Sequence, residues 1–254
     1  MTQYDLGTYS MKITAASPDA QSWFDQGLIW IYAYNHEEAI TCFEKVLAAD
    51  PGCAMAHWGI AYAIGPNYNK PWEAFEEDEK PDCITRAQAA IAQALALKDQ
   101  VSDLEQAIIA AVAHRYPSDA TIEEFAPWND AYADAMRGVH KQHSDNLDVC
   151  CLFAEAIMNR TPWQLWDLPT GEPAEGADTL EAVAVLETAF NDLDGAWDHP
   201  GLLHMYIHLM EMSPHPERAL RQGDALSTLV PDAGHLLHMP THVDVLCGDY
   251  QNVV

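Results

Sequence analysis

The sequence predicts an all-α protein, arranged as a right-handed solenoid of helical hairpins. Its 254 residues are 49% hydrophobic, which is enough to bury a large core. Segments rich in Ala and Leu recur without the alternation of apolar and polar residues that marks β-strands. Two histidine pairs, His204 with His208 and His238 with His242, are offset by 34 residues. That offset is the period of a helix-turn-helix repeat.

The strongly negative net charge of the chain limits the kinds of molecule that it is expected to bind. The chain has 12 Lys and Arg against 39 Asp and Glu, which gives a formal net charge of -27. Such a chain repels phosphate backbones and anionic lipid surfaces, so neither nucleic acid nor a membrane is expected as a partner. Most of the acidic residues are expected on a solvated outer surface.

The first residues, MTQYDLGTYSMKIT, lack the basic start and apolar run of a secretory signal, and no apolar stretch has the length of a membrane span. We therefore expect a cytoplasmic protein. The six cysteines include no CxxC pair, which favours reduced, mostly buried thiols over a disulfide framework.

The repeat is first legible in residues 20–53, after an N-terminal segment of residues 1–19. Aromatic and small residues stand there at fixed positions, and Pro follows the second expected helix. This pattern resembles the tetratricopeptide repeat, in which small residues let two helices touch while large ones fill the space beside them. The residues that carry the resemblance are Trp23, Gly27, Trp30, Ala39, Phe43, Val46 and Pro51.

The same frame predicts further repeats within a single solenoid over residues 20–254. They cover residues 54–101, 102–146, 147–199 and 200–233, and an incomplete sixth repeat covers 234–254. Repeats two, three and four carry insertions between their two helices, and loops on one edge of a solenoid are where binding sites form. The sixth repeat stops at DYQNVV, so we expect either a homodimer through this uncapped repeat or a longer protein.

Longer strings strengthen the resemblance. CAMAHWGIAYAIGPNYN, EAIMNRTPWQLWD and PDAGHLLHMPTHVDVLCGDY are similar to a group of bacterial and fungal tetratricopeptide-repeat proteins with an HMPxH signature. The resemblance covers most of residues 20–254. It implies an α-solenoid and supplies no activity.

The histidine pairs predict a metal site. In a tetratricopeptide repeat the first helix of each repeat lines the concave groove, and the second packs outside. Imidazoles one turn apart project from the same face of a helix, so two neighbouring first helices would surround one ion. The expected metal ligands are His204, His208, His238 and His242, with His235 as a substitute ligand.

Nitrogen ligands favour a transition metal such as Zn, Cu or Fe over Ca or Mg. Four bound histidines would make a closed structural site, whereas three plus water would leave a position for catalysis. Glu211 and Glu155 also face the predicted groove and are the candidate catalytic residues, as groups that move a proton. Below about pH 6 protonation of the histidines should release the metal.

Three functions follow from this arrangement. The first is a metal-dependent enzyme, an oxidoreductase or a hydrolase, that acts on a small molecule in a pocket covered by the inserted loops. Trp163 and Trp166 in the longest insertion would form its lid or simply anchor that loop. The second is an interaction module that holds a peptide or protein in the groove. The third is a structural metal clip that joins the fifth and sixth repeats.

Overall fold

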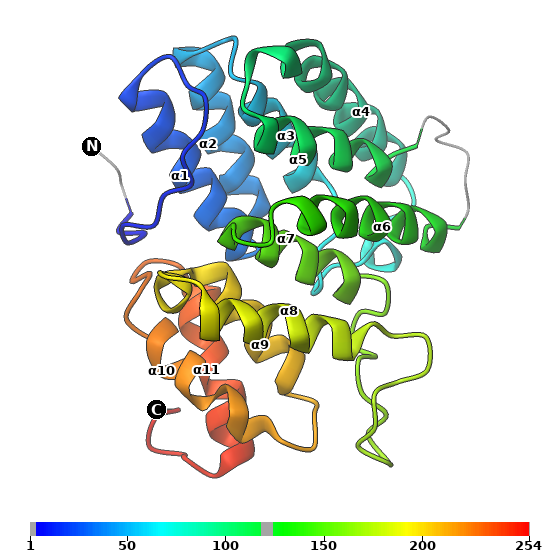
Figure 1. Ribbon diagram of the computed structural model, residues 1–254, viewed down its shortest axis with the longest axis vertical. Coiled ribbons are helices and arrows are strands. Elements are labelled where there is room, and N and C mark those ends of the chain that lie inside the picture. The colour runs from blue at the N-terminus through cyan, green and yellow to red at the C-terminus, as the bar shows by residue number, and fades with distance from the viewer. Residues whose placement is uncertain (1–3, 118–123, 254) are drawn as a thin grey trace. The chain divides into compact units, whose positions relative to one another are not determined.

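The structure is a computed structural model that describes residues 4–117 and 124–253 (Figure 1). These residues form eleven α-helices, several short 3-10 helices and no strand, so the all-α prediction is confirmed. None of the described helices is long and apolar enough to cross a membrane. The chain divides into two compact units, a first unit of Ser10–Ser144 and a second unit of Met1–Tyr9 with Asp145–Val254.

The first unit contains three consecutive helix pairs, at the places where the first three repeats were predicted. The buried ring of Phe43 packs in their core against Gly27 and Gly59. A Cβ atom on Gly27 would lie 2.7 Å from the Phe43 ring, and one on Gly59 would lie 2.5 Å from it. The helices are α1 (Pro18–Tyr32), α2 (His36–Ala49), α3 (Ala54–Ile64), α4 (Lys80–Leu97), α5 (Asp103–Val112) and α6 (Ala126–Gln142), with 3-10 helices η1 (Trp72–Ala74), η2 (Lys98–Gln100) and η3 (Ala113–Arg115).

The loop between α3 and α4 packs into this core. Trp72 is fully buried and stacks on Phe125 at a centroid distance of 4.7 Å. Arg115, 1% exposed, donates to the carbonyl oxygens of Tyr62 and Pro66. The insertion predicted in the third repeat falls partly on residues 118–123, which lie outside the described residues.

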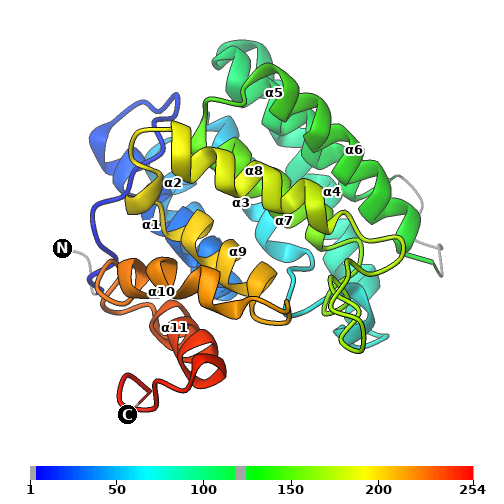
Figure 2. The ribbon, with the colours of Figure 1, turned by 60° about the horizontal axis from the view of Figure 1, so that its bottom comes forward.

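The second unit is built around one buried helix, α9. Every residue of α9 is buried, and the helix contacts α7, α8, α10 and α11, which surround it in Figure 2. The elements are α7 (Leu147–Met158), α8 (Thr179–Asp192), η4 (Ala196–Asp198), α9 (Pro200–Met210), η5 (Pro216–Ala219), α10 (Leu220–Leu226) and α11 (Gly234–Cys247).

The start of α9 is fixed by a buried cap. Nδ1 of His199 accepts a hydrogen bond of 3.1 Å from the amide of Leu202. Its Nε2 lies 3.4 Å from Oδ1 of Asp148 on α7, and its ring lies 4.4 Å from that of Tyr9. Pro200 at the first helical position loses no hydrogen bond there. The axial position of α9 is therefore set before His204, the first predicted metal ligand on this helix.

Residues near the start of the chain complete the second unit. The amide of Asp5 donates to Oδ2 of Asp232 at 2.6 Å, and the amide of Asp232 donates to the carbonyl of Asp5 at 3.0 Å. Gly7 has a φ of 73°, and a Cβ atom there would lie 2.4 Å from the carbonyl oxygen of Leu229. This segment is thus pinned to the loop before α11.

Helix α11 continues through Pro240, although proline lacks the amide hydrogen that a helix interior uses. Pro240 packs against Gly223 of α10, where an added Cβ atom would lie 3.4 Å away. Helix α11 exposes Leu237, Val245 and Leu246.

Candidate metal centre

Helix α9 holds two imidazoles in the buried interior of the second unit. His204 and His208 are one turn apart on the helix, and their ring centroids are 4.6 Å apart. His204 is 0% exposed and His208 is 1% exposed. A buried polar side chain has to find a hydrogen-bonding or metal partner inside the protein, because it has given up its water.

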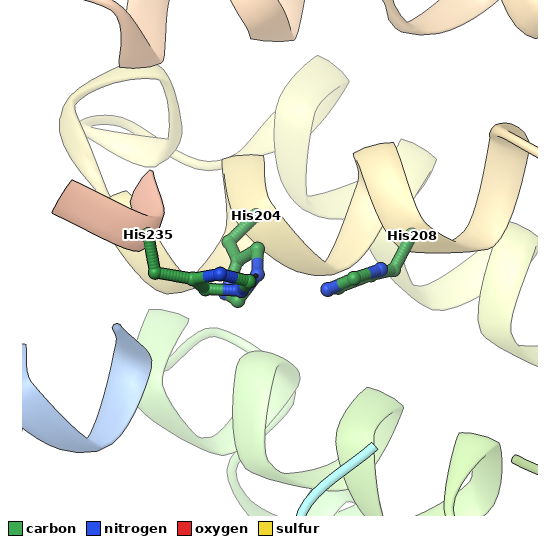
Figure 3. A group of neighbouring side chains, drawn as sticks. All are labelled: His204, His208 and His235. Atoms are coloured by element: carbon green, nitrogen blue, oxygen red, sulfur yellow. Dashed lines mark hydrogen bonds between the residues drawn. The ribbon is translucent and has the colours of Figure 1, made fainter. Parts of the chain in front are cut away.

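The first turn of α11 supplies the third imidazole. Nε2 of His235 lies 3.0 Å from Nε2 of His204. Taken together, one ring nitrogen from each of His204, His208 and His235 lies within 4.8 Å of the other two. Figure 3 shows the three rings gathered on one side of α9. We call these three residues the histidine trio.

The spacing of the trio suits a tetrahedral ion. Two nitrogens bound at 2.0 to 2.1 Å with tetrahedral angles are about 3.3 Å apart. The 3.0 Å between His204 and His235 is close to that value. The remaining separations, at most 4.8 Å, need a rotation of the His208 ring to shorten them. A metal would then replace the direct contact between two imidazoles.

Glu211 orients His208 through a hydrogen bond to one of its two ring nitrogens. Nδ1 of His208 donates to Oε1 of Glu211 at 2.9 Å, which makes Nε2 of His208 the lone-pair donor. Nδ1 of His242 donates to Oε2 of the same carboxylate. Burial alone would raise the pKa of Glu211, but the two histidine hydrogen bonds hold it at about 2. Glu211 is therefore a carboxylate at neutral pH.

His208 and His235 are neutral at pH 7. Burial lowers the pKa of His208, against the opposing effect of Glu211. Burial, and then the neighbouring imidazoles His208, His238 and His242, lower the pKa of His235 to about 4. Only a neutral imidazole binds a metal ion, so these two ligands need not lose a proton first.

His238 and His242, predicted as ligands, lie outside the trio. Nε2 of His238 lies 2.8 Å from Nε2 of His242, and His238 is exposed. This departs from the predicted quartet, in which His235 was the substitute. The physical reason is the register of the two helices. The hydrogen-bonding contacts of His204 with His235 and of Glu211 with His242 each join residues 31 positions apart.

That separation is three residues shorter than the 34-residue repeat. Three residues correspond to about 4.5 Å along a helix. His208 and His242, which are 34 positions apart, also lie near one another, with ring centroids 6.5 Å apart. The i, i+3 spacing of His208 and Glu211, which places both on one helix face, is the sequence signal for the carboxylate that supports the site.

Glu155, the other predicted catalytic carboxylate, lies on α7 and is 2% exposed. Its negative charge and, to a greater extent, burial raise the pKa of Cys151, one turn earlier, well above the ordinary value. Cys151 is thus a thiol at neutral pH, as the sequence predicts for the buried cysteines. Glu155 shares the buried interior of the second unit with the trio.

The loop between α7 and α8 reaches the trio through a tryptophan. Trp163 lies edge-on to His208, with ring centroids 6.0 Å apart, and is 42% exposed. Its φ is 63°, a left-handed conformation that is rare for a residue with a Cβ atom. Nε1 of Trp166 donates to the carbonyl of Leu209 at 2.6 Å. Of the two tryptophans, Trp166 anchors the loop and Trp163 faces the site.

Comparison with known proteins assigns the chain to no family. No model of a known protein family matches the chain, and neither a search of curated proteins nor one of solved structures finds a match.

Proposed function

We propose that this protein binds a transition metal ion through His204, His208 and His235. The observation that carries the proposal is a group of three imidazoles, two of them buried and one half-buried, with one ring nitrogen of each within 4.8 Å of the others. Imidazole is the ligand that Zn, Cu and Fe accept readily in proteins, whereas Ca and Mg prefer oxygen. The group comes from two helices whose placement is fixed by the cap at His199 and by the packing of α11 on α10.

Glu211 has the place of a carboxylate that orients a metal-binding histidine. Such a group fixes the tautomer and strengthens the ligand without binding the metal itself. It also accepts from His242, which in turn contacts the exposed His238. This revises the role predicted for Glu211, which now orients a ligand instead of moving a proton at the substrate.

Three histidines leave the fourth position of a tetrahedral ion for water or a substrate, and this arrangement favours a metal-dependent enzyme. A bound ion would polarise a substrate oxygen or make water a stronger nucleophile. In this chain Glu155 is the candidate for moving the proton, because Glu211 is engaged by two histidines. Trp163 supplies an apolar wall beside His208.

The proposed setting is a solenoid of tetratricopeptide-like hairpins. Six first helices begin where the repeats were predicted to begin, and second helices follow the first five. Within each unit, successive first helices contact one another, α1 with α3, α3 with α5, α7 with α9 and α9 with α11. A stack of hairpins requires such contacts.

The structural metal clip is the second candidate, favoured by the origin of the ligands on two successive first helices. A clip and a catalytic centre differ in the fourth coordination position. Cobalt substitution followed by azide titration separates them, because azide changes the visible spectrum only where a position is open. A peptide-binding groove is the function to pursue if the protein binds no metal.

Metal analysis of the purified protein and of single variants tests the proposal. We expect close to one equivalent of Zn, Cu or Fe in the wild type. His204→Ala, His208→Ala and His235→Ala should each lower the affinity about 1,000-fold, since each removes one of three ligands. The matched control is His215→Ala, which changes a histidine whose side chain is 62% exposed. Full metal content in all three trio variants would refute the site.

A further inference from the structure

The second unit has a cavity of about 320 Å³ lined by residues of η4, α8, α9, η5 and α10. Tyr206 of α9 lines it and stands midway between His204 and His208 in the sequence. Two residues along a helix are about 200° apart, so the cavity and the histidine trio occupy different faces of α9. Its size is within the range of pockets that hold small molecules.

Cationic and aromatic groups form one wall. The guanidinium of Arg221 lies over the ring of Trp197, 4.2 Å from its centre. Trp197 is braced by Phe190, with ring centroids 4.9 Å apart and a hydrogen bond of 3.1 Å from its Nε1 to the Phe190 carbonyl. Among the described residues no carboxylate forms an ion pair with Arg221, although the chain has 39 acidic side chains.

The other charged side chains of the lining, Glu187 and Arg218, neutralise one another. Glu187 accepts hydrogen bonds from Arg218 and from the hydroxyl of Tyr206 at 2.6 Å. Burial, and then the contact with Glu187, raise the pKa of Tyr206 far above its ordinary value. The phenol is therefore protonated at neutral pH, and the set contributes no net charge. Arg221 is the remaining cation of the cavity.

Gln222 adds an unsatisfied acceptor to the lining. Its residue is 6% exposed, and its buried Oε1 accepts no hydrogen bond from any described residue. A buried acceptor left in this state costs about 1 to 3 kcal/mol. A ligand that donates a hydrogen bond to Oε1 would remove that cost.

We propose that this cavity binds a small aromatic carboxylate that also carries a hydroxyl or amino group. The carboxylate pairs with the planar guanidinium of Arg221, which is suited to two parallel hydrogen bonds. The ring packs on the aromatic surface of Trp197 and Phe190. The hydroxyl or amino group donates to Gln222. The carboxylate uses a guanidinium that has no ion pair among the described residues, and the hydroxyl or amino group uses an acceptor that has no hydrogen bond there.

Calorimetric titration with three probes tests the assignment. The probes are 4-hydroxybenzoate, benzoate, which lacks the hydroxyl, and 4-hydroxybenzyl alcohol, which lacks the charge. We expect 4-hydroxybenzoate to bind with a dissociation constant below about 1 mM. Each of the other two should bind at least about 10-fold more weakly, because each loses one polar contact.

Variants assign the contacts. Arg221→Gln should weaken 4-hydroxybenzoate by about 10- to 100-fold and leave the alcohol unchanged. Gln222→Leu should weaken both hydroxylated probes and leave benzoate unchanged. Arg86→Gln, at an exposed position on α4, is the matched control, and circular dichroism confirms that each variant is folded. Absence of saturable binding for all three probes, or wild-type affinity for 4-hydroxybenzoate in Arg221→Gln, would overturn the proposal.

Discussion

The two units bury polar groups for different purposes. In the first unit Arg115 is buried and donates to backbone carbonyl oxygens, and its guanidinium lies 4.4 Å from the ring centre of Tyr62. In the second unit His204, His208 and Glu211 are buried and face other ionisable side chains. Arginine donates only, so it can satisfy carbonyls but cannot bind a cation. The first arrangement completes a fold, whereas the second gathers side chains of the kind that can bind a cation.

The inserted loops show the same contrast. The loop after α3 buries Trp72 completely, and the loop after α7 leaves Trp163 42% exposed beside His208. Both loops leave the first helix of a predicted repeat at its C-terminal end. Equivalent insertions thus close the core in one unit and cover a candidate site in the other.

The largest expected effect on stability comes from replacing Trp72 and Trp163, one at a time, by Ala. Trp72→Ala should destabilise the first unit by about 4 kcal/mol, because it empties a fully buried aromatic position. Trp163→Ala should cost less than about 1 kcal/mol, since much of the ring is already in water. Urea unfolding, with hydrogen exchange to assign the change to a unit, measures both. Equal losses in the two variants would abolish the contrast between the loops.

Arg115→Met tests the polar group that completes the first unit. We expect a loss of about 3 kcal/mol, because the carbonyls of Tyr62 and Pro66 lose their donor in a buried place. Metal affinity should not change. Arg86→Met at an exposed position is the control, and a neutral outcome for Arg115→Met would show that water satisfies these carbonyls.

Glu211→Gln tests the polar group of the second unit. An amide keeps one acceptor oxygen for two imidazole donors, so we expect metal affinity to fall by about 10- to 100-fold. Glu155→Gln should leave the affinity unchanged and abolish any turnover that is found. Competition titration with a chromogenic chelator measures both variants. A larger loss of metal in Glu155→Gln would exchange the roles assigned to the two carboxylates.

The smallest expected effect is that of mild acid on metal binding. Protons compete with the metal only below the pKa of each free imidazole, and the pKa of His235 is about 4 while that of His208 is also lowered. Between pH 7.5 and 5.5 we therefore expect at most about a 10-fold loss of affinity. Three histidines with the ordinary pKa of 6.5 would lose about 1,000-fold over that range. Metal release near pH 6 would show that the trio is less shielded than its burial implies.

The boundaries of the helix pairs could be predicted because Pro, Gly and small residues mark them locally. Gly27 is an example, because it lets the ring of Phe43 approach closely, as the pattern of small and large residues predicts. The histidine trio could be predicted only in part. His204 and His208 share one helix, so their proximity follows from their spacing. Whether His235 or His238 faces them depends on how far α11 slides along α9, which side-chain packing decides.

The cavity beside α9 was missed because no metal-binding or catalytic motif marks it. Its signal in the sequence is indirect. Arg218, Arg221 and Gln222 lie within one short stretch of a chain that has only 12 basic residues, and i, i+3 and i, i+4 spacings place them on one side of a helix. Trp197 joins them only through the turn that leads into α9.

The contact of Asp5 with Asp232 has a consequence for biosynthesis. These residues are separated by 227 positions, so the second unit cannot close until residue 232 has left the ribosome. At 5 to 20 residues per second, this takes about 10 to 45 seconds after residue 5 is made. The first unit, residues 10–144, is synthesised entirely within that interval, so it can fold on the nascent chain. Residues 4–9 can complete the second unit only after Asp232 has been made.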